Sequence, residues 1–252
     1  MPPYVVTQAE AKAIGRELFA GRKALFDRLQ GVFDNAGIEK RHTVAPIEWY
    51  AGDHRWESRN ALYLESAEEL FLGAAGKAIA AAGLTAADID GVVCVSTTGI
   101  ATPSLEARCG PRLGLRQDVR RVPVFGLGCA GGVSGLATAA RLAAAEPGTR
   151  WLFVCIETCS ISIRLDSDDP AALVATALFG DGAAAVVVST DGVGHASVTA
   201  ASERLWPDTL GIMGWRVEDP GFAVVFDRAI PPFVTAELAE AIDTMLGEFD
   251  VP

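Results

Sequence analysis

The chain has 252 residues, with 21 lysines and arginines against 32 aspartates and glutamates, so its formal charge is −11. Half of the residues are apolar, which is enough to form a hydrophobic core and excludes a disordered chain. The acidic balance disfavours a nucleic-acid partner, because binding phosphates requires a basic surface. No apolar run reaches the roughly 18–20 residues that span a bilayer. Five cysteines without a pairing pattern indicate reduced thiols in a cytoplasmic protein.

Helical patterns dominate the first third of the chain. Thr7, with Glu10 three residues later, is expected to cap the first helix. A second helix is predicted near residues 22–35. The spacing of apolar residues over 61–82 predicts a long helix, which Gly83 is expected to end.

Apolar segments typical of strands alternate with helices in the middle of the chain. Residues 91–97 and 122–125 are predicted to be buried strands, and the second of them leads into a glycine-rich turn at 126–132. An alanine-rich helix, 130–145, and a further strand, 151–156, follow. This alternation predicts an α/β fold with a mixed or mostly parallel sheet.

Two hairpins and a helix are predicted for the last third. The first hairpin is expected from residues 183–188 and 195–200, and the second from 216–217 and 222–226. A pair of prolines at 231–232 is expected to open the final helix.

The glycine-rich turn has two interpretations, and the first is a dinucleotide site. Gly126, Gly128 and Gly131 give the pattern G-x-G-x-x-G between a strand and a helix. Glu157 lies at the end of the next predicted strand, where a ribose-binding acid would be placed. Because glycine-rich turns are common in α/β proteins, this pattern is a weak signal.

The second interpretation centres on Cys129, which lies where the strand ends and the helix begins. The partial positive charge of a helix N-terminus favours the thiolate. Flanking glycines let a bulky thioester approach the sulfur, and nearby N–H groups can hold an oxyanion. The position suits a nucleophile for acyl transfer, but a small buried hydrophobic residue is the commoner role of a lone cysteine, so position alone leaves both interpretations open.

Several segments carry a family resemblance. Residues 128–132 (GCAGG) resemble the nucleophile motif of type III polyketide synthases, the chalcone and stilbene synthase family of the thiolase superfamily. Residues 154–160 and 177–185, the second containing FGDGAAA, are similar to that family's most recognisable stretch, and 212–215 (IMGW) continues the match. Ketoacyl-carrier-protein synthase III-like enzymes are the near alternative, but they lack the GCAGG context.

The resemblance implies a thiolase-like α/β fold, of which this chain is the N-terminal half: a mixed, mostly parallel sheet flanked by helices. Residues 1–230 would be the chalcone/stilbene synthase N-terminal domain, and residues 231–252 the start of a truncated C-terminal domain. Half of such a fold exposes the apolar faces of its central helices, which predicts poor solubility without a partner.

The resemblance also implies an acyltransferase that loads acyl-CoA on Cys129 and extends it with malonyl-CoA to a polyketide. It implies a homodimer with CoA thioesters as substrates and without a cofactor or metal. The positions that match the family's substrate-binding residues are Thr97, Thr102, Ser162, Phe179, Gly214 and Val224.

Three of these positions have more specific expected roles. Phe179 matches an aromatic gatekeeper between the CoA tunnel and the reaction cavity, and Thr102 lies in the loop that reaches the partner subunit's cavity. Val224 falls where plant enzymes have a second aromatic gatekeeper. A smaller residue there implies a roomier pocket, which fits a long aliphatic starter at least as well as an aromatic one. Arg28 matches one of the family's basic contacts to CoA.

The sequence departs from the family in one respect. The family mechanism uses a histidine and an asparagine beside the cysteine, to hold the thiolate and to stabilise the enolate formed from malonyl-CoA. Only His195 follows Cys129, in a context that predicts a surface residue, while Asn35 and Asn60 both precede it. The chain alone is therefore expected to perform at most the loading step. A non-catalytic half that binds CoA or a homologous subunit is the alternative.

Two further clusters predict no metal site. Cys155 and Cys159 give a C-x-x-x-C pattern without a second pair of ligands. The acidic run of Asp166, Asp168 and Asp169 lies in a polar segment, where solvation accounts for it.

Overall fold

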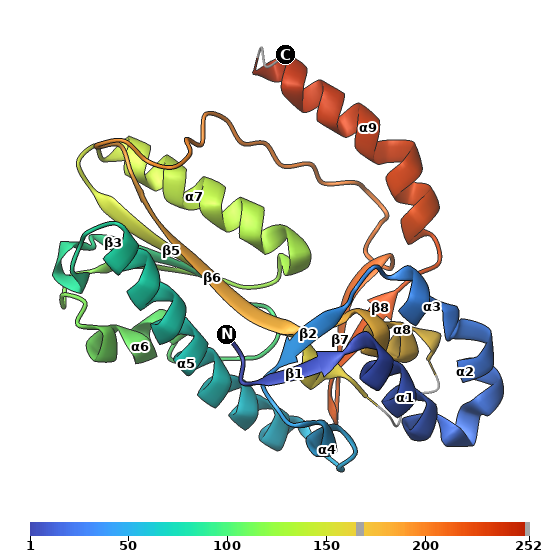
Figure 1. The fold of residues 1–252 in the computed structure, drawn as a ribbon. Coiled ribbons are helices and arrows are strands. Elements are labelled where there is room, and N and C mark those ends of the chain that lie inside the picture. Colours follow the sequence, from blue (N-terminus) through green and yellow to red (C-terminus); the bar gives the residue numbers. More distant parts are fainter. Residues whose placement is uncertain (165–168, 250–252) are drawn as a thin grey trace.

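The computed structural model describes residues 1–164 and 169–249 (Figure 1). Asp166 and Asp168 of the acidic run, and the last residues of the predicted 231–252 segment, lie outside this part. Within it, the central sheet has four strands in the order β4-β3-β5-β6. They are β3 (Gly91–Val95), β4 (Arg120–Val124), β5 (Arg150–Thr158) and β6 (Asp181–Ser189).

The sheet is mixed. β3 pairs in parallel with both β4 and β5, whereas β6 runs antiparallel to β5. The carboxyl ends of β3, β4 and β5 therefore lie at the same edge of the sheet, and β6 begins at that edge with Asp181 opposite Thr158. The predicted α/β class with a mixed sheet is confirmed.

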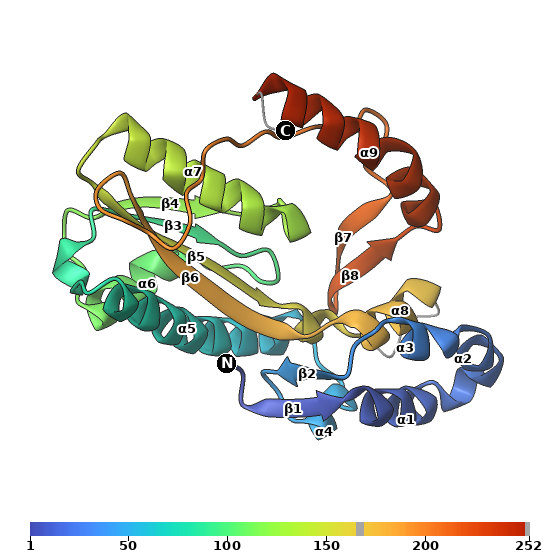
Figure 2. The same cartoon turned by 45° about the horizontal axis from the view of Figure 1, so that its top comes forward.

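Helices cover both faces of the sheet (Figures 1 and 2). α5 (Trp56–Ala81) and α6 (Leu105–Leu113) lie on one face, and α7 (Gly131–Ala145) lies on the other. Because side chains alternate along a strand, Val92 and Cys94 join the core beneath α5, while Val93 and Val95 join the core beneath α7.

A smaller helical part adjoins the end of the sheet (Figure 2). Its two-stranded sheet pairs β1 with β2 in antiparallel fashion. Phe19, Phe26 and Phe33 are buried here with residues of α8. The elements are β1 (Tyr4–Thr7), α1 (Gln8–Leu18), η1 (Ala20–Arg22), α2 (Lys23–Leu29), α3 (Gly31–Asn35), β2 (Lys40–Thr43), α4 (Ile47–Tyr50) and α8 (Pro170–Leu178).

The remaining elements connect or follow these layers. The hairpin of β7 and β8 packs against α8, and α9 projects beyond it (Figure 1). These elements are η2 (Ala86–Asp88), η3 (Gly128–Ala130), η4 (Cys159–Ser162), β7 (Met213–Glu218), β8 (Gly221–Phe226) and α9 (Ile230–Glu248).

Most of the predicted elements are present. Thr7 and Glu10 form the expected capping box: the Glu10 N–H donates to Thr7 Oγ1 (3.2 Å) and the Thr7 N–H donates to Glu10 Oε2 (2.8 Å). The hairpin across 216–226 and the proline-led final helix are also confirmed. The long helix starts five residues earlier than predicted, at Trp56.

Two predictions are wrong. The single helix at 22–35 is divided into α2 and α3 at Gln30, where the Phe33 N–H bonds to the Gln30 carbonyl in a tighter turn. The first hairpin does not form, because residues 183–188 belong to β6 and pair with β5 along its whole length. Residues 195–200 are not a strand.

The last helix has an unburied apolar face. No described residue of α9 is buried, and Val234, Leu238 and Ile242 are each more than two-fifths exposed. The expectation of exposed apolar faces concerned the central helices rather than this last one, and it stays a prediction, as does the predicted poor solubility. No described helix combines the length and apolarity that a bilayer span requires.

Candidate active site

Cys129 lies in the turn between β4 and α7. After β4 ends at Val124, Gly126 and Gly128 adopt positive φ angles of 95° and 53°, which a side chain would disfavour. The short helix η3 then leads directly into α7. The Cys129 side chain is exposed, so the alternative of a small buried cysteine is wrong.

The start of α7 is pressed against the sheet. A Cβ atom on Gly131 would lie 2.6 Å from Val95 Cγ1, and one on Gly135 would lie 2.5 Å from Phe153 Cε2. No side chain caps the N-terminus of α7, and the Gly131 N–H bonds to the Gly128 carbonyl, so the short helix that carries Cys129 runs directly into α7. The partial positive charge of this helix N-terminus lies beside Cys129 and favours negative charge that develops there during a reaction.

The other thiols have a different environment. Cys94 and Cys109 are buried, and Cys155 and Cys159 are half-buried. Burial raises the pKa of each of them, to about 12 for Cys109 and about 11 for Cys155. Because the thiolate is the nucleophilic form, Cys129 is the cysteine best placed to react.

Cys159, Glu157 and Thr97 lie at the same edge of the sheet as Cys129. Burial raises the pKa of the Cys159 thiol, and the charges of Glu157 and Asp181 raise it further. The Thr97 N–H donates to both carboxylate oxygens of Glu157 at 3.1 Å. Burial raises the pKa of Glu157, and the Thr97 hydroxyl oxygen is buried without a hydrogen-bond partner among the described residues.

The contacts of Glu157 argue against the interpretation of the glycine-rich turn as a dinucleotide site. A ribose-binding acid must present its carboxylate to the ligand, but the Glu157 carboxylate is half-buried and bound by the protein backbone. The turn glycines serve instead to reverse the chain and to let α7 approach β3.

Phe179 and Val224 meet at a second group of residues. Val224 is buried with Ala171 and Ala175 of α8, and the rings of Phe179, Trp215 and Phe226 pack around them. The Phe179 ring lies edge-to-face with the Trp215 ring (centroids 5.9 Å apart) and the Phe226 ring (5.7 Å). Gly214, on β7, is exposed.

The short helix η4 connects the two groups. It begins at Cys159 and ends at Ser162, whose hydroxyl donates to the Cys159 carbonyl (2.7 Å). It also packs against β8, the strand that carries Val224. Ser162 is buried on η4, and its predicted role in lining the cavity stays a prediction.

Asp181 fixes this region, and the sequence reasoning did not select it. Its carboxylate accepts bonds from the Ser160 N–H (2.8 Å), the Ser160 hydroxyl (2.5 Å) and the Val44 N–H (2.7 Å). Burial raises its pKa. The sequence did contain a signal for this role, since Asp181 is the single aspartate within an apolar run. A carboxylate in such a run is expected to be buried, and a buried carboxylate needs several hydrogen-bond donors.

Thr102 and Arg28 lie apart from these groups. Thr102 is exposed in the loop between β3 and α6, and Arg28 is exposed on α2. Within the described residues, neither forms a hydrogen bond or ion pair with the Cys129 or Phe179 groups, so their predicted roles stay predictions.

The histidines are engaged or placed elsewhere. The His42 ring nitrogen lies 3.2 Å from the Pro2 carbonyl, and His54 stacks on Trp49. His195 is exposed in the segment after β6. The described residues hold no group of three or more His, Cys, Asp or Glu side chains suited to a metal.

Comparison with known proteins identifies the family. The profile of the chalcone and stilbene synthases, N-terminal domain, matches residues 22–192. The chain belongs to the chalcone and stilbene synthase family. Its sequence is 42% identical to 1,3,6,8-tetrahydroxynaphthalene synthase of Streptomyces peucetius subsp. caesius, over 98% of this chain and 67% of that protein. It is 32% identical to a putative chalcone synthase of Bacillus subtilis (strain 168), over 98% and 72%.

The solved structures agree with this membership. The crystal structure of 1,3,6,8-tetrahydroxynaphthalene synthase from Streptomyces coelicolor A3(2), a bacterial type III polyketide synthase, has a TM-score of 0.93 and 29% identity, and covers 98% of this chain and 71% of that one. The resemblance and the thiolase-like fold are thereby confirmed. Nothing in these comparisons supports a ketoacyl-carrier-protein synthase III-like enzyme.

Proposed function

We propose that this protein is an acyltransferase of the type III polyketide synthase class, which takes an acyl group from acyl-CoA onto Cys129. One observation carries the proposal. Cys129 is an exposed thiol at the N-terminus of α7, whereas the other cysteines are buried or half-buried with a raised pKa. That all five thiols are unpaired supports the predicted cytoplasmic location.

Loading is a thioester exchange. The Cys129 thiolate attacks the thioester carbonyl carbon, and the partial positive charge at the start of α7 stabilises the oxyanion. The bond from that carbon to the CoA sulfur then breaks, and the CoA thiolate takes up the proton that Cys129 had lost. The acyl chain extends past Thr97 and Ser162 toward Phe179 and Val224.

Extension by malonyl-CoA is the second part of the proposal. Loss of carbon dioxide leaves an enolate, which attacks the acyl–Cys129 thioester carbon, forms a carbon–carbon bond and releases the Cys129 sulfur. The family performs this step with a histidine and an asparagine. His42 and His54 have other partners, and His195 is exposed. We therefore expect this chain by itself to accept an acyl group on Cys129 without extending it with malonyl-CoA.

The test is acyl loading followed by mass spectrometry. The protein is incubated with a series of acyl-CoAs, the intact mass is measured, and the adduct is located by peptide mapping. We expect one adduct, at Cys129, which is absent in Cys129→Ala and retained in the matched control Cys155→Ala. An unmodified Cys129 in folded protein, or equal loading of all cysteines, would contradict the proposal.

Extension and assembly have separate tests. Adding the C-terminal part of the Streptomyces peucetius relative as a second chain is expected to enable release of carbon dioxide from malonyl-CoA. A homodimer in which Thr102 reaches the partner's cavity is expected from sedimentation, with the dimer weakened by a charged residue at position 102.

A further inference from the structure

Arg41 is a buried arginine whose side chain reaches the C-terminal end of α8. It is 8% exposed. Its Nη1 donates to the carbonyls of Thr176 (2.8 Å) and Phe179 (3.2 Å), and its Nη2 donates to the carbonyl of Ala177 (2.8 Å) and to Gln8 Oε1. Because α8 ends at Leu178, these are carbonyls that the helix itself leaves without N–H partners. Arg41 therefore caps α8 from a strand 135 residues earlier in the chain.

The charge of Arg41 has no acidic partner. Within residues 1–164 and 169–249, its guanidinium bonds only to carbonyl and amide oxygens. Removing a charge from water is costly unless other groups compensate. The partial negative charge at a helix C-terminus compensates here, and the rigid fork of an arginine can bind several carbonyls at once. A lysine or a neutral side chain could not hold the same set.

The segment around Arg41 holds both sides of the turn that follows α8. A Cβ atom on Gly180 would lie 3.1 Å from Arg41 Cβ, so the turn is packed closely against β2. Beyond it, the Val44 N–H donates to Asp181 Oδ2 at 2.7 Å. The backbone from Phe179 to Asp181 is thus fixed by residues 41–44.

The Phe179 ring is held differently from its backbone. The ring contacts Trp215 and Phe226 of the β7–β8 hairpin, in the same cluster as Val224. The backbone anchor on β2 therefore determines how far the ring extends toward the hairpin. A shift at the Phe179 carbonyl would move the ring relative to Val224.

We propose that Arg41 is a positioning residue, which fixes the Phe179 ring relative to Val224 and so sets which acyl chain lengths reach Cys129. This inference rests on the proposed function, because Phe179 can select among acyl chains only if they pass it on the way to Cys129.

The experiment compares loading from a short and a long acyl-CoA. Loading rates at Cys129 with butyryl-CoA and dodecanoyl-CoA are measured by mass spectrometry for the wild type and Arg41→Met. Iodoacetamide, which is small, measures the intrinsic reactivity of Cys129. We expect the long-to-short ratio in Arg41→Met to change by roughly five- to tenfold, in the same direction as in Phe179→Ala. The iodoacetamide rate should stay within about twofold. Arg41→Lys, which keeps the charge but not the fork, should give an intermediate ratio.

The control separates positioning from general loss of stability. Asp90→Ala weakens the opposite end of the central sheet, where β3 and β5 begin, and should leave the ratio unchanged. An unchanged ratio in Arg41→Met, or an equal change in Asp90→Ala, overturns the inference while the proposed function stands. If Arg41→Met does not fold, the ratio in Arg41→Lys decides in the same way. Absence of loading in the wild type overturns the proposed function, and this inference with it.

Discussion

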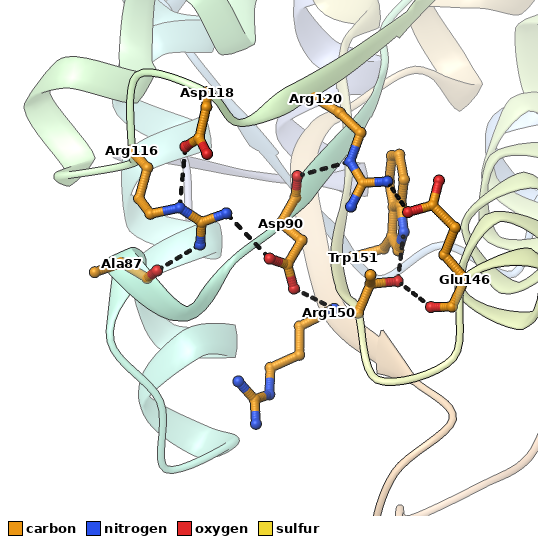
Figure 3. A network of polar contacts seen from close by, with 9 residues as sticks. Ala87, Asp90, Arg116, Asp118, Arg120, Glu146, Arg150 and Trp151 are labelled. Carbon is orange, nitrogen blue, oxygen red and sulfur yellow. Dashed lines mark hydrogen bonds and ion pairs between the residues drawn. The ribbon is translucent and has the colours of Figure 1, made fainter.

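Asp90 joins the starting ends of three strands of the central sheet, and replacing it with alanine is predicted to destabilise the fold (Figure 3). Its carboxylate accepts the Arg150 N–H at 2.9 Å and Arg116 Nη2 at 3.0 Å, while its carbonyl accepts the Arg120 N–H at 3.0 Å. A charge-assisted bond to the backbone contributes about 1.5–3 kcal/mol. The partly exposed pair with Arg116 adds about 0.2–1 kcal/mol. Asp90→Ala should therefore lose about 2–3 kcal/mol at pH 7 and lower Tm by roughly 5–10 °C.

The loss should depend on pH in a defined direction. The Arg150 N–H, followed by the Arg116 and Arg120 guanidinium groups, lowers the pKa of Asp90 below its usual value of 3.8. A carboxylate with a lowered folded-state pKa stabilises the protein above the unfolded-state pKa, and this stability is lost as pH falls through the folded-state value. The difference in free energy of unfolding between wild type and Asp90→Ala should thus be largest near neutral pH and shrink in acid.

Urea unfolding from pH 7 down to about pH 3 measures this difference, and other carboxylates cancel because they titrate in both proteins. Asp90→Asn keeps an oxygen for the Arg150 N–H but loses the charge, so its free energy of unfolding should lie between those of the wild type and Asp90→Ala. A difference below about 0.5 kcal/mol at pH 7, or one that stays constant into acid, would refute the reasoning.

Three further predictions concern the candidate site. Gly135→Ala should cost about 1–3 kcal/mol in urea unfolding, since its Cβ would meet the Phe153 ring. The same change at Gly132, where an added Cβ would meet no atom from outside its own helix within 4 Å, should be neutral or stabilising. With a pKa of about 11, Cys155 should be about 0.1% thiolate at pH 8. Its alkylation rate should therefore rise about tenfold per pH unit up to pH 10. Alkylation of Cys155 as fast as that of Cys129 at pH 8 would contradict this prediction. Val224→Phe should reduce loading from long acyl-CoAs relative to short ones in a competition assay, whereas Val225→Phe, on the other face of the hairpin, should not.

Local patterns in the sequence were sufficient for most elements of the fold. The capping box at Thr7, the apolar spacing of α5 and the turn before β8 involve residues close together in the chain, so propensity and periodicity specify them. Pairing between distant segments was harder. From their sequence alone, residues 183–188 could pair with a following strand in a hairpin or with an earlier strand. The structure shows that they pair with β5, in an antiparallel ladder of nine residues.

The position of the candidate nucleophile, Cys129, was predictable for the same reason that the long helix was. A strand, a glycine turn and a helix are consecutive in the sequence, and together they place Cys129 at a helix N-terminus. By contrast, Arg41 and Asp181 act on residues more than 100 positions away. Nothing near Arg41 in the sequence indicates that it binds carbonyls rather than a carboxylate, so its role emerges only from the fold.

The prediction of a roomier pocket rested on one position, Val224. The size of the pocket also depends on the residues that the pairing of β7 with β8 places opposite it. Opposite Val224 on β7 lies Trp215, and both Trp215 and Phe226 place their rings against Phe179. The space that a small residue at position 224 leaves is therefore bounded by two aromatic rings that the comparison at a single position does not include. Which acyl chains fit should depend on Trp215 and Phe226 as much as on Val224, and on the backbone anchor that holds Phe179 between them.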